Sequence, residues 1–143
     1  MSNEVETALN PLHVALRTAS DHARDFAELA DDAGLASLFR TLAGRHAAQA
    51  DQLEHQIRED GLPKMPDPER ELITRSLAHL KARLTEDRDA ALVKAQQSAE
   101  QEIVRAGSAA LETALPEPAR QLIGRILEAV LNDQAELARV KPG

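Results

Sequence analysis

Four polar residues lie within or beside the apolar stripes of this sequence, and all four can bind metal ions: His22, His46, Glu100 and Asp133. A stripe here is a set of apolar residues that repeat at steps of three and four along a helix. His46 and Asp133 take positions inside their stripes, whereas the other two lie at stripe margins. A buried polar group costs free energy unless it has a partner, so such residues usually bind one another or a ligand.

Imidazole and carboxylate groups together suit iron, manganese or zinc. All four residues lie near the middle of their predicted helices, so they would converge in an antiparallel bundle. In that case they predict a metal site between helices, without any catalytic residue. A structural interpretation stays open beside this one. His46 would then be a core histidine with satisfied hydrogen bonds, Glu100 would pair with a nearby base, and Asp133 would lie on a helix flank.

Other chemistry has less support in the sequence. His22 with Asp25, and Asp51 with His55, have spacings that allow chelation from one helix. The remaining histidines are expected to face solvent: His13, His55 and His79. The chain has no cysteine, which excludes disulfides and thiolate metal sites. It also lacks a phosphate-binding glycine loop, a zincin motif and a nucleophile triad, so hydrolase activity is not expected.

Composition and charge limit the partners. The chain of 143 residues is predicted to be one domain, residues 1–143. A net charge of −7 argues against nucleic-acid binding and against adhesion to anionic membranes. No apolar run approaches the roughly 20 residues of a membrane span. The polar N-terminus does not resemble a signal peptide, so a cytoplasmic location is expected.

Periodicity and composition together predict an all-α fold. Ala, Leu, Glu, Gln and Arg are strong helix formers, whereas aromatic and β-branched residues are scarce. Apolar stripes predict helices over 3–32, 35–59, 68–84, from an interruption at 85–88 to 114, and over 117–140. Four long helices and a short one predict an antiparallel four-helix bundle with a crossover.

Several segments resemble a bacterial family of ferritin-like four-helix bundles without an assigned function. The clearest is Leu77–Leu92, followed by Ser98–Glu102 with Leu111 downstream, and the rhythm of Asp21–Ile57 is also similar. The resemblance covers most of the chain. It implies a ferritin-like bundle with the short helix in its middle crossover, and it makes Glu100 the position most like an inward carboxylate.

The chain departs from this family at the residues that matter most. Ferritin-like di-iron centres take Glu-x-x-His from two helices and a Glu from each of the other two. No Glu-x-x-His occurs in this sequence, and Gly107 stands where the family tends to have an aromatic residue. We therefore expect a non-enzymatic bundle with a structural, interaction or stress-related role. The alternative is a metal-binding protein that uses the reduced set of four residues named above.

The short predicted helix carries an apolar side with two interpretations. Its members are Ile73, Leu77, Leu80 and Leu84. They could cover the core of the bundle itself, or they could form the interface of a homodimer.

Overall fold

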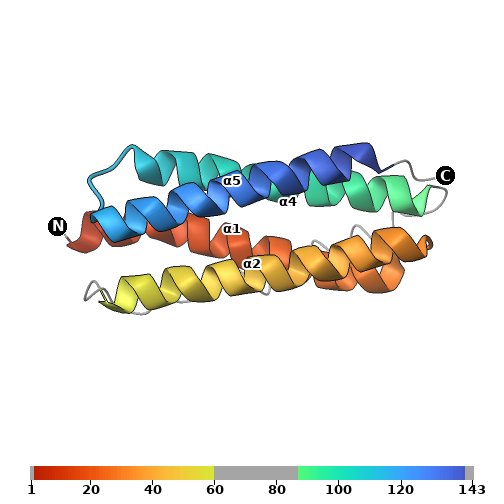
Figure 1. Cartoon of the computed structure of the whole chain (residues 1–143), viewed down its shortest axis with the longest axis horizontal. Coiled ribbons are helices and arrows are strands. Elements are labelled where there is room, and N and C mark those ends of the chain that lie inside the picture. Colours follow the sequence, from red (N-terminus) through yellow and green to blue (C-terminus); the bar gives the residue numbers. More distant parts are fainter. Residues whose placement is uncertain (1, 60–86, 141–143) are drawn as a thin grey trace.

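The computed structural model describes residues 2–59 and 87–140, and within them it confirms an all-α bundle (Figure 1). The helices are α1 (Ser2–Leu29), α2 (Ala33–Glu59), α4 (Arg88–Leu111) and α5 (Glu117–Arg139). Each begins and ends within about three residues of the range that periodicity predicts, and no strand occurs in the described part of the chain. The predicted helix 68–84, with the apolar residues considered for a dimer, lies outside the described residues.

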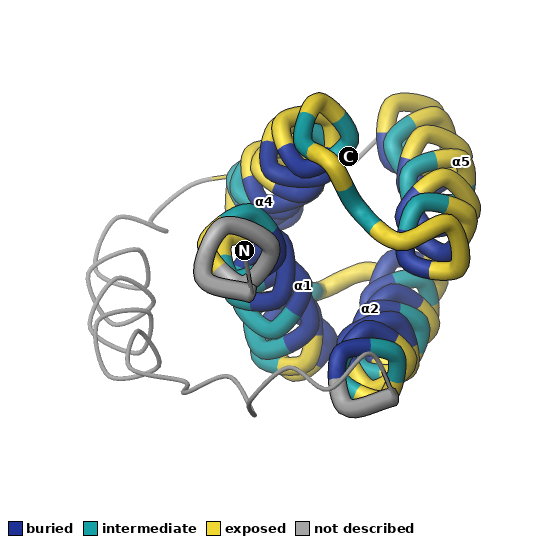
Figure 2. Tube along the Cα trace, turned by 90° about the vertical axis from the view of Figure 1, so that its left-hand side faces the viewer, coloured by how far each residue is buried: buried dark blue, intermediate teal, exposed yellow. Residues whose placement is uncertain are grey.

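The four helices surround a common interior, with buried residues on their inward faces (Figure 2). In Figure 1, α1 leads away from the N-terminal end and α2 leads back beside it, while α4 and α5 form a second such pair. Helix α1 packs against both α2 and α4, and α5 packs against the same two helices. None of these helices is long and apolar enough to cross a membrane, as far as the described residues extend.

Two carboxylates connect the turn between α1 and α2 to the start of α4. Asp32 caps α2 by accepting from the Leu35 backbone N–H at 2.8 Å. Asp89, on the first turn of α4, accepts from the backbone N–H groups of Asp31 and Asp32 at 2.8 and 3.0 Å. The first bond satisfies a donor that the start of α2 leaves without a partner inside the helix, and the other two satisfy backbone donors of the turn. They also fix the height of α4 relative to α1 and α2.

The expected interruption before α4 is present at Asp87, which caps the helix. Asp87 has non-helical backbone angles (φ −110°, ψ 78°), and its side chain accepts from the Ala90 N–H at 3.2 Å. No continuous helix therefore passes through Asp87.

The interior has two apolar clusters, one toward each end of the bundle. The first apolar cluster contains Leu9, Leu12, Ala15, Leu16, Ala19, Ala50, Leu53, Ile57, Ala99, Ile103, Ala106, Ala110, Leu122, Ile123, Ile126 and Val130. The second apolar cluster contains Ala23, Phe26, Ala27, Leu35, Phe39, Leu42, Ala43, Leu92, Val93 and Leu137. Along each helix these residues recur mainly at steps of three and four, as an apolar stripe requires. Where the helices pass from one cluster to the other, they bury polar side chains, which we call the polar layer: Ser20, His46, Gln49, Gln96, Glu100 and Asp133.

Helices α4 and α5 approach each other closely at Gly107. A Cβ atom added there would lie 2.6 Å from Leu127 Cδ2 and 3.1 Å from its Cγ. A larger side chain at this position would force Leu127 to move. The Leu127 side chain of α5 therefore fills the space beside this glycine.

Candidate metal centre

Three of the four predicted site residues meet in the polar layer. His46 on α2, Glu100 on α4 and Asp133 on α5 are all 0% exposed. One possible ligand atom from each lies within 4.8 Å of the others. Three helices that are far apart in the sequence thus bring one imidazole and two carboxylates together at the centre of the bundle.

Helical periodicity explains why these side chains point inward. His46 follows Leu42 by four residues, and Asp133 lies three residues after Val130 and four before Leu137. Residues three or four apart share a helix face, so each polar group shares the inward face of its apolar neighbours. These buried neighbours fix the direction in which each ligand points.

His46 is held by partners on both ring nitrogens. Its Nε2 lies 2.8 Å from Glu100 Oε1 and 2.7 Å from Oε2, and its Nδ1 lies 2.8 Å from Gln49 Oε1. Asp133 Oδ2 is 4.0 Å from the same Nε2. Gln49 thus accepts from Nδ1–H and directs Nε2 toward both carboxylates. A second proton or a metal ion on Nε2 would complete this arrangement.

Glu100 has a second partner that the sequence analysis did not single out. Gln96, one turn earlier on α4 and 0% exposed, donates from Nε2 to Glu100 Oε2 at 2.8 Å. The same nitrogen lies 3.2 Å from the Ala19 carbonyl oxygen of α1. The sequence could have indicated this partner, because Gln96 is a polar residue four positions before Glu100 and therefore lies on the same helix face.

Asp133 is shared between an arginine and the site. Arg45 donates from Nη1 to Asp133 Oδ1, while Oδ2 is buried without a hydrogen-bond partner. Burial raises the pKa of the Asp133 carboxyl above its ordinary value, and the charge of Arg45 opposes that shift. A buried oxygen of this kind needs a partner, which a water molecule or a cation could supply.

His22 does not belong to this cluster. Its ring lies beside that of Phe26, with centroids 5.5 Å apart, and neither ring nitrogen has a hydrogen-bond partner. Burial lowers the pKa of His22, although the charges of Asp21 and Asp25 oppose that shift. The imidazole therefore favours its neutral form beside an aromatic ring, away from the three converging ligands.

The expectations for the other histidines had mixed outcomes. His13 was expected to face solvent, which is wrong, because it is only 3% exposed on the inward side of α1. His55 is exposed, as predicted, and His79 lies outside the described residues. Asp51, considered as a chelating partner of His55, accepts from Arg17 at 2.6 Å.

The metal-free protein should lose stability as the pH rises above about 6.5. Burial alone would lower the pKa of His46, but the hydrogen bond and charge of Glu100, with help from Gln49 and Asp133, raise it overall. The folded protein then holds the His46 proton more tightly than the unfolded chain does. The stability that this proton contributes is fully present below the pKa of His46 in the unfolded chain. It is lost as the pH rises through the pKa of His46 in the folded protein.

Urea unfolding in the presence of a chelator, from about pH 6 to about pH 9, would measure this loss. A His46→Gln variant should not show this loss of stability with rising pH. Equal pH dependence in the two proteins over this range would contradict the assignment.

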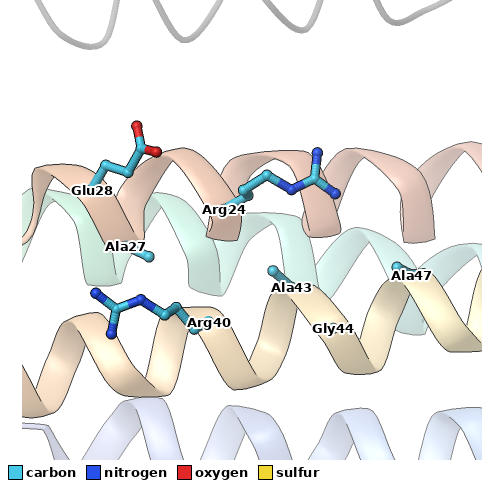
Figure 3. Close-up of a pocket in the computed structure, with 7 residues that line it drawn as sticks. All are labelled: Arg24, Ala27, Glu28, Arg40, Ala43, Gly44 and Ala47. Carbon is cyan, nitrogen blue, oxygen red and sulfur yellow. The ribbon is translucent and has the colours of Figure 1, made fainter.

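One hollow on the surface of the bundle lies away from this cluster. It has a volume of about 360 Å³ and opens between α1 and α2 on the outside of the bundle (Figure 3). Its walls are Arg24, Ala27, Glu28, Arg40, Ala43, Gly44 and Ala47, none of which is a ligand of the cluster. The cluster is therefore part of the packed interior and does not line this hollow.

The chain matches no protein-family model and no curated protein. The ligands in the cluster can be compared with those of a ferritin-like di-iron centre. A di-iron centre uses four carboxylates and two histidines. The described cluster offers one histidine and two carboxylates, so it does not fit a di-iron centre. Its size suits a single ion.

Proposed function

We propose that this chain is a non-enzymatic metal-binding protein that holds one divalent transition-metal ion between α2, α4 and α5. The observation that carries the proposal is the convergence of His46, Glu100 and Asp133, each 0% exposed, with one ligand atom from each within 4.8 Å of the others. The ligand types suit zinc, iron or manganese.

The surrounding contacts are those that a metal site requires. A metal-binding histidine usually donates its other N–H to an acceptor that fixes the tautomer. Gln49 Oε1 is such an acceptor for His46 Nδ1, and Gln96 orients Glu100 in a comparable way. These two glutamines would keep the ligand atoms in place as an ion enters.

The proposal includes a ferritin-like, antiparallel arrangement of the bundle. Its support is the course of the chain in Figure 1, where neighbouring helices lead in opposite directions. In this arrangement α2 and α4 are not neighbours, which lets His46 and Glu100 face each other across the interior. The fold would thus have kept an inward metal position while using a smaller ligand set.

Titration calorimetry with Zn²⁺, and with Mn²⁺ and Fe²⁺ under anaerobic conditions, tests the proposal on protein stripped with a chelator. We expect one ion per chain and a higher melting temperature in saturating metal. Free metal at 100 times its Kd would add about 2.7 kcal/mol to the free energy of unfolding. Elemental analysis of protein purified without a chelator should show the same stoichiometry.

Ligand variants locate the ion. His46→Ala and Glu100→Gln should each abolish stoichiometric binding, with circular dichroism confirming that both remain helical. His55→Ala is the matched control, because it removes an exposed imidazole from the same helix. Wild-type protein that binds none of the three ions, with an unchanged melting temperature, would refute the proposal.

We propose a purely structural or interaction role as the second candidate. Its support is that each charge in the polar layer already faces an opposite one, since Arg45 pairs with Asp133 and a protonated His46 would pair with Glu100. In that case the layer would specify how the helices pack without any ion. The pH dependence predicted above would then appear in protein that binds no metal.

A further inference from the structure

Arg45 connects the surface of the bundle to its buried centre. Its side chain is 37% exposed, yet its guanidinium pairs with Asp133, whose side chain is 0% exposed. Arg45 is the residue immediately before His46 in α2, and it is not itself one of the proposed metal ligands. A fixed positive charge therefore lies one carboxylate away from the place proposed for the ion.

Because of this pairing, the two carboxylate oxygens of Asp133 have different surroundings. Oδ1 accepts from Arg45, whereas Oδ2 is buried without a partner and lies 4.0 Å from His46 Nε2. Oδ2 thus has both lone pairs free for an ion, whereas Oδ1 already accepts from Arg45. Arg45 would keep Asp133 monodentate and hold the number of protein ligands at three.

The charge balance has a second consequence. Glu100 and Asp133 contribute −2, and Arg45 reduces this to −1, while a metal-bound His46 is neutral. One divalent ion then leaves the buried centre at +1, and a second divalent ion would leave it at +3. Without Arg45, a single divalent ion would make the centre neutral. Uncompensated charge at a buried site is costly, so Arg45, although 37% exposed, opposes the first divalent ion and opposes a second one more strongly.

We infer that Arg45 regulates the site: it weakens the binding of divalent metal by occupying Asp133 Oδ1 with a fixed positive charge, and it limits the site to one ion. The inference rests on the proposed function. Arg45 acts here as an internal cation that balances Asp133 whether or not a metal is bound. The metal binds against this charge, so its release is easier than the ligands alone would allow.

Zn²⁺ affinity, measured by competition with a chromophoric chelator, tests the inference in wild type, Arg45→Gln and Arg45→Lys. A like charge at this range shifts proton binding by one to three powers of ten, and a divalent ion is at least as sensitive. We expect Arg45→Gln to bind Zn²⁺ at least about tenfold more tightly than wild type. Arg45→Lys, which keeps the charge, should stay near the wild-type affinity.

Arg40→Gln is the matched control, since Arg40 lies on the same helix at the outer hollow (Figure 3), and its affinity should equal that of wild type. If Arg45 only oriented Asp133, Arg45→Gln would bind Zn²⁺ more weakly, and that result would overturn the inference. Equal affinity in Arg45→Gln and wild type would also overturn it, while leaving the proposed function intact. If Arg45→Gln bound Zn²⁺ and wild type did not, the inference would be supported. If neither protein bound Zn²⁺, both this inference and the proposed function would be overturned.

Discussion

Replacing Glu100 with alanine should lower the free energy of unfolding of the metal-free protein by about 3–5 kcal/mol. The carboxylate is fully buried and accepts from both His46 Nε2 and Gln96 Nε2. Its removal leaves His46 Nε2 without its acceptor, takes one of two acceptors from Gln96 Nε2, and leaves a cavity between α2 and α4. Because His46 would also lose its closest negative partner, its proton would be less tightly held in the folded state.

Urea unfolding at pH 6, where the His46 contribution is still present, is the measurement. Glu102→Ala is the matched control, because Glu102 lies half a turn away on α4, is exposed, and pairs with Arg105 at the surface. That change should alter stability by no more than about 0.5 kcal/mol. If Glu100→Ala and Glu102→Ala had similar effects, the buried pair would not contribute as the structure indicates.

The helices and their inward faces can be predicted from a local property of the sequence, the periodic spacing of apolar residues. The stripe through Leu42, His46 and Leu53 is periodic, and all three residues are buried. A polar residue that replaces an apolar one inside such a stripe must point into the core with its neighbours. Two of the three converging ligands, His46 and Asp133, could be recognised for this reason.

Residues at stripe margins are harder to place, because small rotations of a helix decide their surroundings. Glu100 and His22 both lie at margins, yet only Glu100 joins the cluster, while His22 contacts Phe26. His13 is buried for a similar reason, although its sequence position suggested exposure. Such outcomes depend on how neighbouring helices are rotated and staggered, which one helix's periodicity does not contain.

The partners of the ligands were not predictable from spacing alone. Arg45 precedes His46 and would be assigned to the solvent side, but its long side chain reaches Asp133 on another helix. Long arginine side chains can cross such distances while their stems stay at the surface. The net charge of the cluster is therefore a property of the assembled bundle.

Phe39→Ala should lower the free energy of unfolding by about 3–5 kcal/mol while leaving Zn²⁺ affinity within about threefold of wild type. Phe39 is fully buried in the second apolar cluster, where its ring meets that of Phe26 edge-on with centroids 5.6 Å apart. No residue of the polar layer belongs to that cluster. The cavity would therefore weaken the bundle without displacing the ligands, as long as the protein remains folded.

Chemical unfolding and chelator competition on the same samples would separate the two effects. Leu131→Ala, at a position 54% exposed, should change neither stability nor affinity by a measurable amount. A stability loss below about 1 kcal/mol for Phe39→Ala would show that its ring is not packed as the structure has it. A large loss of Zn²⁺ affinity in the still-folded variant would instead show that the second apolar cluster positions His46, so that stability and binding share one set of contacts.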